Sequence, residues 1–540
     1  MKLARIFQDG MMLQCGRKNL IWGSAETEEK IEVKINDTLV CSTLVKKGDW
    51  AFLIPSQKSM TNAKVQIGNI TLQNVDFGEV WVAGGQSNME FALEFCQEWP
   101  QVQNEDEDEH LRFYTVGQYS FAEERSLGYK NWHKNWDKWK TYSRENRADF
   151  SAVAVFFAKN LRKNGIPVGI VSCNCGSSTA SSWLDYRYLA ADKDLRSYLD
   201  DYDVLRKYLA NPEFTAIKDK VRENMYSQAS VEAMKGMMKY TLSQKEFLSK
   251  IPKMPALPFI DPNVVNPIKA VTWGPKDINA PSALYENMLK EIAGFSVRGV
   301  IWYQGESDDE KAEIYGKLFT ALIKCWRELW KKRNEEMTDL PFIFAQLAPL
   351  GIWGMTSGVK YPVIRKKQED VSMNVENTFM ISTSDVGNVY DIHPKQKEPV
   401  GERFALSARK HVYNEDICAD SPKAVSAVIN EKKIIITFEN AKELHIKEKN
   451  FESFNGFKFE SLANLFAPPI TDNLCGLWVN INGIECKDIR CSVQENKLIL
   501  QSDKFEDKAK IAVLFATTPF YEVNLYNEGN LPAFPFSFML

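Results

Sequence analysis

The chain has 540 residues, of which 44% are hydrophobic and 12% aromatic, and its formal net charge is −4. This length is too great for one ordinary domain, and the apolar content is ample for packed cores, so we expect a globular protein with several domains. The slightly acidic charge offers no basic surface for a phosphate backbone, which argues against nucleic acid as a partner.

The start of the sequence contains no continuous apolar stretch, and no run approaches the roughly 18 apolar residues of a membrane-spanning helix. The ten cysteines are scattered, and the closest pair, Cys173 and Cys175, supplies too few ligands for a zinc site. We therefore expect a cytoplasmic protein with reduced thiols, no signal peptide, no membrane partner, no metal and no cofactor.

Residues 1–75 show short apolar clusters separated by Gly, Asn and Asp. Residues 31–35 alternate apolar and charged side chains, which is typical of a strand with one buried face. Further strands are predicted at residues 20–22, 38–40 and 63–67. A small N-terminal β-sandwich accounts for this pattern.

Residues 76–418 alternate between strands and helices, which predicts an α/β domain with a parallel sheet covered by helices on both faces. Residues 185–270 are mostly helical in pattern and charged, and we expect them to form an insertion in this domain. The predicted strands are 80–83, 167–172, 299–303, 342–345 and 379–382, and the main predicted helices are 150–163, 315–333 and 403–411.

Residues 419–540 return to strand patterns. Apolar runs rich in Ile, Val and Leu occur at residues 433–438, 497–500 and 510–515. These β-branched and aromatic residues favour strands, so we expect a second β-rich domain at the C-terminus.

Residues 80–89, which read VWVAGGQSNM, place Ser87 directly after a predicted buried strand. An apolar run without alternation suits a strand of a parallel sheet, and the two glycines end it with a tight turn. Ligands of open α/β sheets bind at the carboxyl ends of their strands. Ser87 is therefore either a nucleophile or a solvated serine in a turn, and this segment alone does not decide between them.

Polar residues follow other predicted strands of the same sheet. They are Gly176, the pair Gln304 and Glu306, and the pair Asp391 and His393. Parallel strands end at one edge, so these residues are expected to gather around Ser87. Acyl transfer needs a nucleophile, a base, an orienting acid and oxyanion donors, and this set offers a candidate for each.

Only five histidines compete for the role of the base. His110 follows the acidic run at residues 105–109, and we expect a solvated loop there. His133 lies among tryptophans, His411 falls inside a predicted helix, and His445 belongs to the C-terminal region. His393 follows a central strand and has a carboxylate beside it, so it is the favoured base; the alternative is a surface histidine before a proline.

The motifs at residues 85–89 (GQSNM), 300–307 (VIWYQGES) and 391–394 (DIHP) resemble those of the sialate O-acetylesterase family. The resemblance extends over nearly the full chain, and this family belongs to the SGNH (GDSL-like) hydrolases. It implies a flavodoxin-like α/β sheet flanked by β-domains. The GxSxG elbow of ordinary α/β-hydrolases is missing.

The resemblance implies that Ser87 is the nucleophile and His393 the base. It also implies that Gly176, Gln304 and the Ser87 backbone N–H bind the oxyanion, while Gln86 and Asn88 join them as substrate-binding residues. We favour Asp391 as the orienting acid, although it lies only two residues before His393, and Glu306 is the alternative. A second departure is Ser177, where relatives commonly have glycine.

The implied function is release of acetate from an O-acetylated sugar by an acyl-serine mechanism. An acetylxylan or acetyl-mannan esterase is one alternative, and a non-catalytic glycan-binding protein is another. Trp132, Trp136 and Trp139 could stack on sugar rings, but their spacing also fits one packed face of a helix. Trp183 and Trp302 either line the site or pack behind it. A metal held by Asp391 and His393 lacks a third ligand, and the oligomeric state is open.

Overall fold

The computed structural model describes residues 1–122, 136–225, 227–239, 246, 249–250, 252, 276–353, 356–448, 470–506 and 509–540. The chain divides into two compact units. Unit 1 comprises Met1–Ala154, Arg162–Val300 and Lys317–Leu340, and unit 2 comprises Val155–Leu161, Ile301–Gly316 and Pro341–Leu540. Each unit is described by itself.

The N-terminal part of unit 1 is built from short strands, as predicted, and most of them pair antiparallel. The alternation in β4 buries Ile31, Val33 and Ile35 while the charged residues between them point outward. The strands are β1 (Lys2–Leu3), β2 (Met12–Gln14), β3 (Asn19–Ala25), β4 (Glu29–Ile35), β5 (Thr38–Val45), β6 (Gly48–Ile54) and β7 (Met60–Ile67).

Strand β8 (Ile70–Gly85) is sixteen residues long and belongs to two arrangements at once. Its first half pairs antiparallel with β7, and its second half pairs parallel with β11 (Val168–Asn174). The predicted boundary at residue 75 therefore lies inside a strand. The division of the chain into three domains stays a prediction.

The larger sheet of unit 1 has the strand order β10-β9-β11-β8. Strand β9 (Asp108–Thr115) is parallel to β11, whereas β10 (Trp139–Tyr142) is antiparallel to β9. The prediction of a wholly parallel sheet is wrong at this edge, and the sheet is mixed. An antiparallel edge strand on an otherwise parallel sheet is common, because an edge strand has a neighbour on one side only.

The acidic run was predicted as a solvated loop that also holds His110, and this is wrong for its last two residues and for His110, although residues 105–107 lie outside the strands and helices. Residues 108–110 begin β9, and the His110 Nδ1 lies 2.8 Å from the carboxylate of Asp76. The same carboxylate pairs at 2.8 Å with Arg112, and both of these side chains are fully buried. Burial of this ion pair explains how a segment so rich in charge forms a strand.

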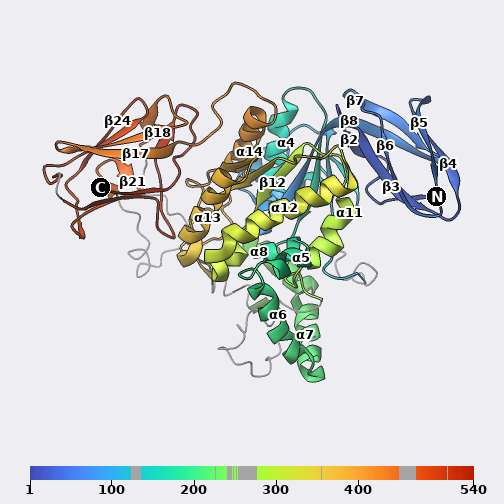
Figure 1. Ribbon diagram of the computed structural model, residues 1–540, viewed down its shortest axis with the longest axis horizontal. Coiled ribbons are helices and arrows are strands. Elements are labelled where there is room, and N and C mark those ends of the chain that lie inside the picture. The colour runs from blue at the N-terminus through green and yellow to red at the C-terminus, as the bar shows by residue number, and fades with distance from the viewer. Residues whose placement is uncertain are drawn as a thin grey trace. The chain divides into compact units, whose positions relative to one another are not determined.

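Helices surround the sheet strands of unit 1. The predicted insertion is helical over its described part, where α6 and α7 lie side by side (Figure 1). Residues 240–275 fall almost wholly outside the described residues. The helices are α2 (Trp99–Val102), α4 (Ala152–Arg162), α5 (Tyr186–Ala191), α6 (Ser197–Leu209), α7 (Pro212–Met225), α8 (Gln228–Met238), α11 (Lys290–Ile292) and α12 (Tyr315–Arg333), of which α4 and α12 each cross a unit boundary.

The sheet strands of unit 2 begin within β12 (Gly299–Tyr303), which is followed in its sheet by β13 and β16. Strands β13 (Phe342–Ala345) and β16 (Thr378–Ile381) are parallel, and helices α13 (Tyr361–Asn374) and α14 (Glu398–His411) both contact β16. All five residues of β12 and all four of β13 are buried, as a strand covered on both faces requires.

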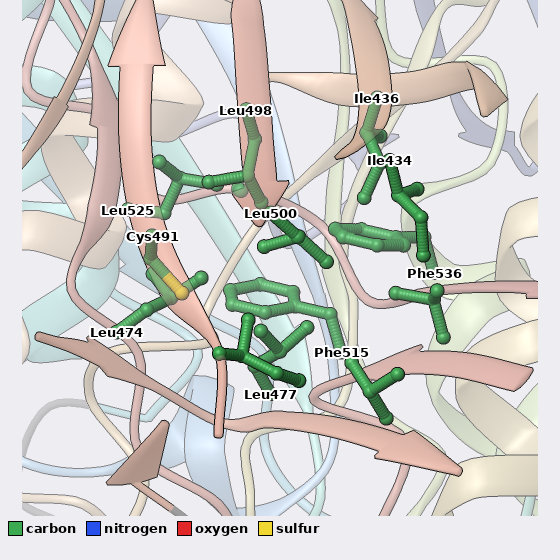
Figure 2. Packing of buried hydrophobic residues seen from close by; sticks show 14 of the residues in the cluster. Ile434, Ile436, Leu474, Leu477, Cys491, Leu498, Leu500, Phe515, Leu525 and Phe536 are labelled. Atoms are coloured by element: carbon green, nitrogen blue, oxygen red, sulfur yellow. The ribbon is translucent and has the colours of Figure 1, made fainter. Parts of the chain in front are cut away.

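The C-terminal part of unit 2 has two four-stranded sheets with the orders β17-β18-β25-β24 and β23-β22-β26-β28. Their apolar side chains meet in one cluster that includes Ile436, Leu498 and Phe515 (Figure 2). The predicted β-rich character of this region is confirmed. The strands are β17 (Lys423–Asn430), β18 (Lys433–Glu439), β19 (Leu444–Ile446), β20 (Ile470–Thr471), β21 (Leu474–Cys475), β22 (Leu477–Ile481), β23 (Ile484–Glu485), β24 (Arg490–Gln494), β25 (Lys497–Gln501), β26 (Ile511–Phe515), β27 (Leu525–Asn527) and β28 (Phe536–Met539). Within the described residues, no helix has the length and apolar character to cross a membrane.

Candidate active site

Ser87 lies at the carboxyl end of β8, where the strand turns into the short helix α1 (Ser87–Glu90). Gly85 makes this turn with φ +133°, a backbone conformation that other residues rarely adopt. The Ser87 side chain is half-exposed, whereas its neighbours Gln86 and Asn88 are buried. The fold therefore presents one serine at the strand end between two buried amides.

Gly176 lies directly beside Ser87 within unit 1. Strand β11 pairs in register with β8, so that Asn174 stands opposite Gly85, and the Cys175 N–H donates to the Gly85 carbonyl at 3.0 Å. A Cβ atom placed on Gly176 would lie 3.6 Å from the Cβ of Ser87. The predicted convergence of these two strand ends is present in the structure.

The Gly176 N–H has a partner that sequence reasoning missed. It donates to the Glu90 Oε2 at 2.5 Å. Glu90 is the last residue of α1, three residues after Ser87, and is half-exposed. Glu90 directly follows the motif at residues 85–89, and this position was a hint that it belongs to the site. The spacing of the sequence does not show that its side chain turns toward Gly176. The role of Gly176 as an oxyanion donor stays a prediction.

Ser177 has a left-handed backbone conformation. Its φ is +60°, and the residue is exposed. This left-handed conformation costs a residue with a Cβ roughly 1–2 kcal/mol, whereas glycine adopts it freely. Ser177 therefore adopts, at this cost, a conformation that glycine would adopt freely.

In unit 2, Gln304 ends β12 with its amide fully buried. The Nε2 donates to Asp308 at 2.6 Å, and the Tyr315 hydroxyl lies 3.1 Å from both the main-chain and side-chain oxygens of Gln304. The Gln368 amide donates to the Gln304 carbonyl at 3.2 Å. These contacts fix the orientation of the Gln304 amide. Its oxyanion role stays a prediction.

Glu306 follows two residues later and is buried. Burial raises the pKa of Tyr303 well above its usual value, and the Glu306 charge raises it further. The pKa values of Tyr315 and Tyr361 rise for the same two reasons. Glu306 is thus a buried carboxylate surrounded by tyrosines that stay protonated.

The Asp391 carboxylate lies beside His393, and its role as the orienting acid stays a prediction. The distance from the His393 Nδ1 to the nearer Asp391 oxygen is 3.8 Å, which is too long for a hydrogen bond. That oxygen accepts from the backbone N–H of His393 at 2.8 Å, and the other lies 3.2 Å from the Lys395 ammonium. Asp391 therefore closes the turn and pairs with a lysine.

His393 is buried and neutral at physiological pH. Its pKa is lowered to about 3, chiefly by burial; the Asp391 charge raises the pKa, and the nearby Lys397 and Lys395 charges lower it. A general base must be neutral, so this condition is met, although a strongly lowered pKa weakens a base. The Trp353 ring meets the imidazole edge-on at 5.4 Å between centroids, a contact that sequence reasoning did not anticipate.

Three of the other histidines have contacts that fit structural roles. His110 pairs with Asp76, as described above. His411 stacks on Phe379 at 4.2 Å and pairs with Asp420, and His445 lies in β19. His133 lies outside the described residues. The preference for His393 rests on these contacts as well as on its position after a central strand.

The tryptophans pack inside the protein where the structure describes them. Trp139 lies in β10 and donates to the Ile6 carbonyl at 2.9 Å, so the predicted helical face is wrong there, because strand pairing with β9 decides its conformation. Trp183 and Trp302 are both buried, which favours packing behind the motifs. Trp136 contacts Tyr119 edge-on, and Trp132 lies outside the described residues. Within the described residues, no group of three or more His, Cys, Asp or Glu side chains could hold a metal ion.

The predicted site residues thus fall into two sets, one in each unit. Unit 1 brings Ser87 and Gly176 together, with Gln86 and Asn88 flanking the serine. Unit 2 holds Gln304, Glu306, Asp391 and His393. Their union in one active site stays a prediction.

Comparison with known proteins supports an esterase. Residues 267–409 match the family model described as "Carbohydrate esterase, sialic acid-specific acetylesterase". The chain is 23% identical to a sialate O-acetylesterase from Rattus norvegicus over 81% of this chain and 78% of the relative. The corresponding protein of Mus musculus is 24% identical over 71% of this chain and 66% of the relative.

The resemblance to sialate O-acetylesterases is confirmed. A crystal structure of a carbohydrate acetylesterase from Xanthomonas citri superimposes with a TM-score of 0.67, covering 99% of both chains at 23% identity. The fold is that of a carbohydrate esterase, with a mixed sheet, helices and additional β-sheets. The prediction of a hydrolytic esterase is confirmed by these sialate O-acetylesterase similarities.

Proposed function

We propose that the chain is a carbohydrate O-acetylesterase that releases acetate from O-acetylated sugars with Ser87 as nucleophile and His393 as base. The observation that carries the proposal is the pairing of Ser87 and Gly176 at the ends of adjacent parallel strands. A half-exposed serine beside a glycine N–H is what acyl transfer requires of a nucleophile and an oxyanion donor. We further propose the SGNH (flavodoxin-like) fold class, in which both sets of residues would form one active site.

The reaction has two halves. The Ser87 Oγ attacks the acetyl carbonyl carbon while His393 takes the hydroxyl proton. The oxyanion is met by the Ser87 and Gly176 N–H groups and by Gln304. When the bond to the sugar breaks, its oxygen receives the proton from His393, and acetyl-Ser87 remains. Water then attacks this ester with His393 again as base, which releases acetate and restores the serine.

The orienting acid is either Asp391 or Glu306. The 3.8 Å separation and the Lys395 partner count against a direct hydrogen bond from Asp391. Glu306 is a buried carboxylate in the same unit as His393, and burial makes such a group effective at stabilising an imidazolium. We favour Glu306 as the acid that orients His393. Asp391 then fixes the backbone turn that carries His393.

A serine-directed phosphonate probe separates catalysis from simple glycan binding. The proposal expects one covalent adduct on wild-type protein, located at Ser87 by peptide mass spectrometry. A glycan-binding protein without a working nucleophile would give no adduct. A probe attached elsewhere while Ser87 stays unmodified would also contradict the proposal.

The sugar is the second question, and a substrate panel answers it. Acetate release is measured with 4-nitrophenyl acetate, an O-acetylated sialic acid, acetylated xylo-oligosaccharides and acetylated manno-oligosaccharides. The sialate similarity leads us to expect the highest kcat/KM for the acetylated sialic acid. A preference for the xylo- or manno-oligosaccharides would identify the chain as an acetylxylan or acetyl-mannan esterase. The proposed acyl-serine mechanism would be unaffected. Turnover of none of the four would contradict the proposed function.

A further inference from the structure

The carboxylate of Glu90 accepts from a backbone N–H beside the proposed nucleophile. The Gly176 N–H donates to the Glu90 Oε2 at 2.5 Å. Glu90 and Ser87 are the two ends of the same helical turn α1, and the Glu90 N–H donates to the Gln86 carbonyl at 2.9 Å. The helix that presents the serine therefore also presents the carboxylate, from the same unit and the same motif.

This contact conflicts with the use of Gly176 as an oxyanion donor. A backbone amide has one hydrogen, and an oxyanion donor must lie about 2.7–3.1 Å from the oxygen on which charge develops. A Cβ on Gly176 would lie 3.0 Å from the Glu90 Oε2 and 3.6 Å from the Ser87 Cβ, so the carboxylate and the nucleophile adjoin the same residue. While the carboxylate stays there, it uses the donor and repels a second negative oxygen.

Resting on the proposed function, we propose that Glu90 is a positioning residue that holds the Gly176 N–H in the free enzyme and yields it to the acyl oxygen of the ester. In the free enzyme the Glu90 carboxylate accepts from the Gly176 N–H, which would otherwise bind water or turn away. The N–H therefore stays directed toward Ser87. The ester carbonyl then replaces the carboxylate. If Glu90 instead anchored the Gly176 turn permanently, replacing Glu90 would have the opposite effects on boronate affinity and on kcat.

The test uses the isosteric variant Glu90→Gln. Its amide oxygen can still accept from Gly176, but a neutral acceptor holds the N–H about half as strongly as a carboxylate does. We therefore expect methylboronic acid, whose adduct with Ser87 places a negative oxygen at the oxyanion position, to bind the variant on the order of 10-fold more tightly. The kcat with 4-nitrophenyl acetate is expected to rise, while a permanent anchor would make both values fall.

The matched control is Glu94→Gln. Glu94 lies one helical turn further along the chain, in Leu93–Phe95, and pairs with Lys239 at 2.5 Å instead of with Gly176. The Glu94→Gln variant removes the same charge, four residues further along the chain. Equal tightening of boronate in both variants would mean that general electrostatics and not the Gly176 contact is responsible, and would overturn the proposal.

The contact itself can be observed without turnover. Labelling with ¹³C-carbonyl cysteine and ¹⁵N-glycine selects the three Cys-Gly amides of the sequence, at Gly16, Gly176 and Gly476. We expect the Gly176 amide proton to move upfield in Glu90→Gln and to respond to boronate in the wild type. An amide that ignores both changes overturns the proposal.

Failure of the inference and failure of the proposed function give different results. Wild-type protein that hydrolyses no acetyl ester and forms no Ser87 adduct overturns both. Active wild-type protein whose boronate affinity is unchanged or weakened by Glu90→Gln overturns only the inference. Glu90→Ala, checked for an unchanged melting temperature, removes the acceptor altogether, so we expect it to bind boronate less tightly than Glu90→Gln, because nothing then holds the Gly176 N–H toward Ser87. Equal or tighter binding by Glu90→Ala would show that the carboxylate only blocks the donor and would overturn its positioning role.

Discussion

The two candidate halves of the site differ in what holds them. The Ser87 half is fixed by backbone: two parallel strands in register bring Gly176 to the serine, and a glycine turn starts the helix. The His393 half is fixed by side chains, because Asp391 binds its own turn and Lys395 while Trp353 meets the imidazole edge. Backbone geometry follows from sequence pattern, whereas the choice among side-chain partners does not. The variants below test this contrast.

Among the variants that change how His393 is held, the largest effect is expected from the acid that orients it. Replacing the true orienting acid by its amide favours the wrong imidazole tautomer and lowers kcat on the order of 10⁴-fold. We expect this loss for Glu306→Gln and a smaller one for Asp391→Asn, measured as kcat with 4-nitrophenyl acetate. Glu310→Gln, an exposed glutamate in the same turn region Glu306–Ile314, is the control. A larger loss in Asp391→Asn would contradict our assignment.

The pH dependence of the free energy of unfolding should reveal the lowered pKa of the buried His393. The His393 pKa is lowered to about 3, so between that pH and its usual value near 6.5 the unfolded chain binds a proton that the folded chain does not. Unfolding is therefore favoured as pH falls through this window, by up to about 1.4 kcal/mol per pH unit. His393→Asn should remove this slope in urea unfolding followed between pH 7 and pH 4. Parallel pH profiles for both proteins would mean that His393 titrates normally.

Trp353 should affect turnover less than the acid does. An edge-on aromatic contact is worth about 0.5–1.5 kcal/mol, so its loss allows the imidazole to move and lowers kcat by up to about tenfold. We expect this for Trp353→Ala, with Trp353→Phe keeping most of the activity. Equal activity of the alanine variant and the wild type would show that the contact does not orient His393.

The smallest effect concerns the backbone half. Ser177 has φ +60°, and glycine relieves about 1–2 kcal/mol of strain while costing about 0.4–1 kcal/mol of unfolded-state entropy. Ser177→Gly should therefore raise the free energy of unfolding by up to about 1.6 kcal/mol, measured by urea denaturation. A destabilised variant would mean that the serine side chain makes a contribution that the turn geometry does not explain.

Much of the fold was predictable because strands and helices have regular patterns. Strand β12, helix α12 and strand β13 have the ends that the sequence predicts, since each is an apolar or periodic run with clear breaks. Strand β9 was missed because its charged residues mask the alternation, and only the burial of Arg112 against Asp76 makes it a strand. That pairing joins residues far apart in the chain.

The site residues were predictable as a set, and their contacts were not. The ends of β8 and β11 follow from strand register, so Ser87 and Gly176 meet as expected. The rotamer that turns Glu90 to Gly176, and the preference of Asp391 for Lys395, depend on competition among local partners. Spacing along a sequence does not encode the outcome of that competition.

Ser87 carries the central claim, and one measurement tests it most directly. Ser87→Ala removes only a half-exposed hydroxyl, so its melting temperature should match that of the wild type. Its kcat for 4-nitrophenyl acetate should fall at least about 10⁴-fold, because no other group supplies the acyl-enzyme route. A folded Ser87→Ala variant that retains wild-type turnover would contradict the account.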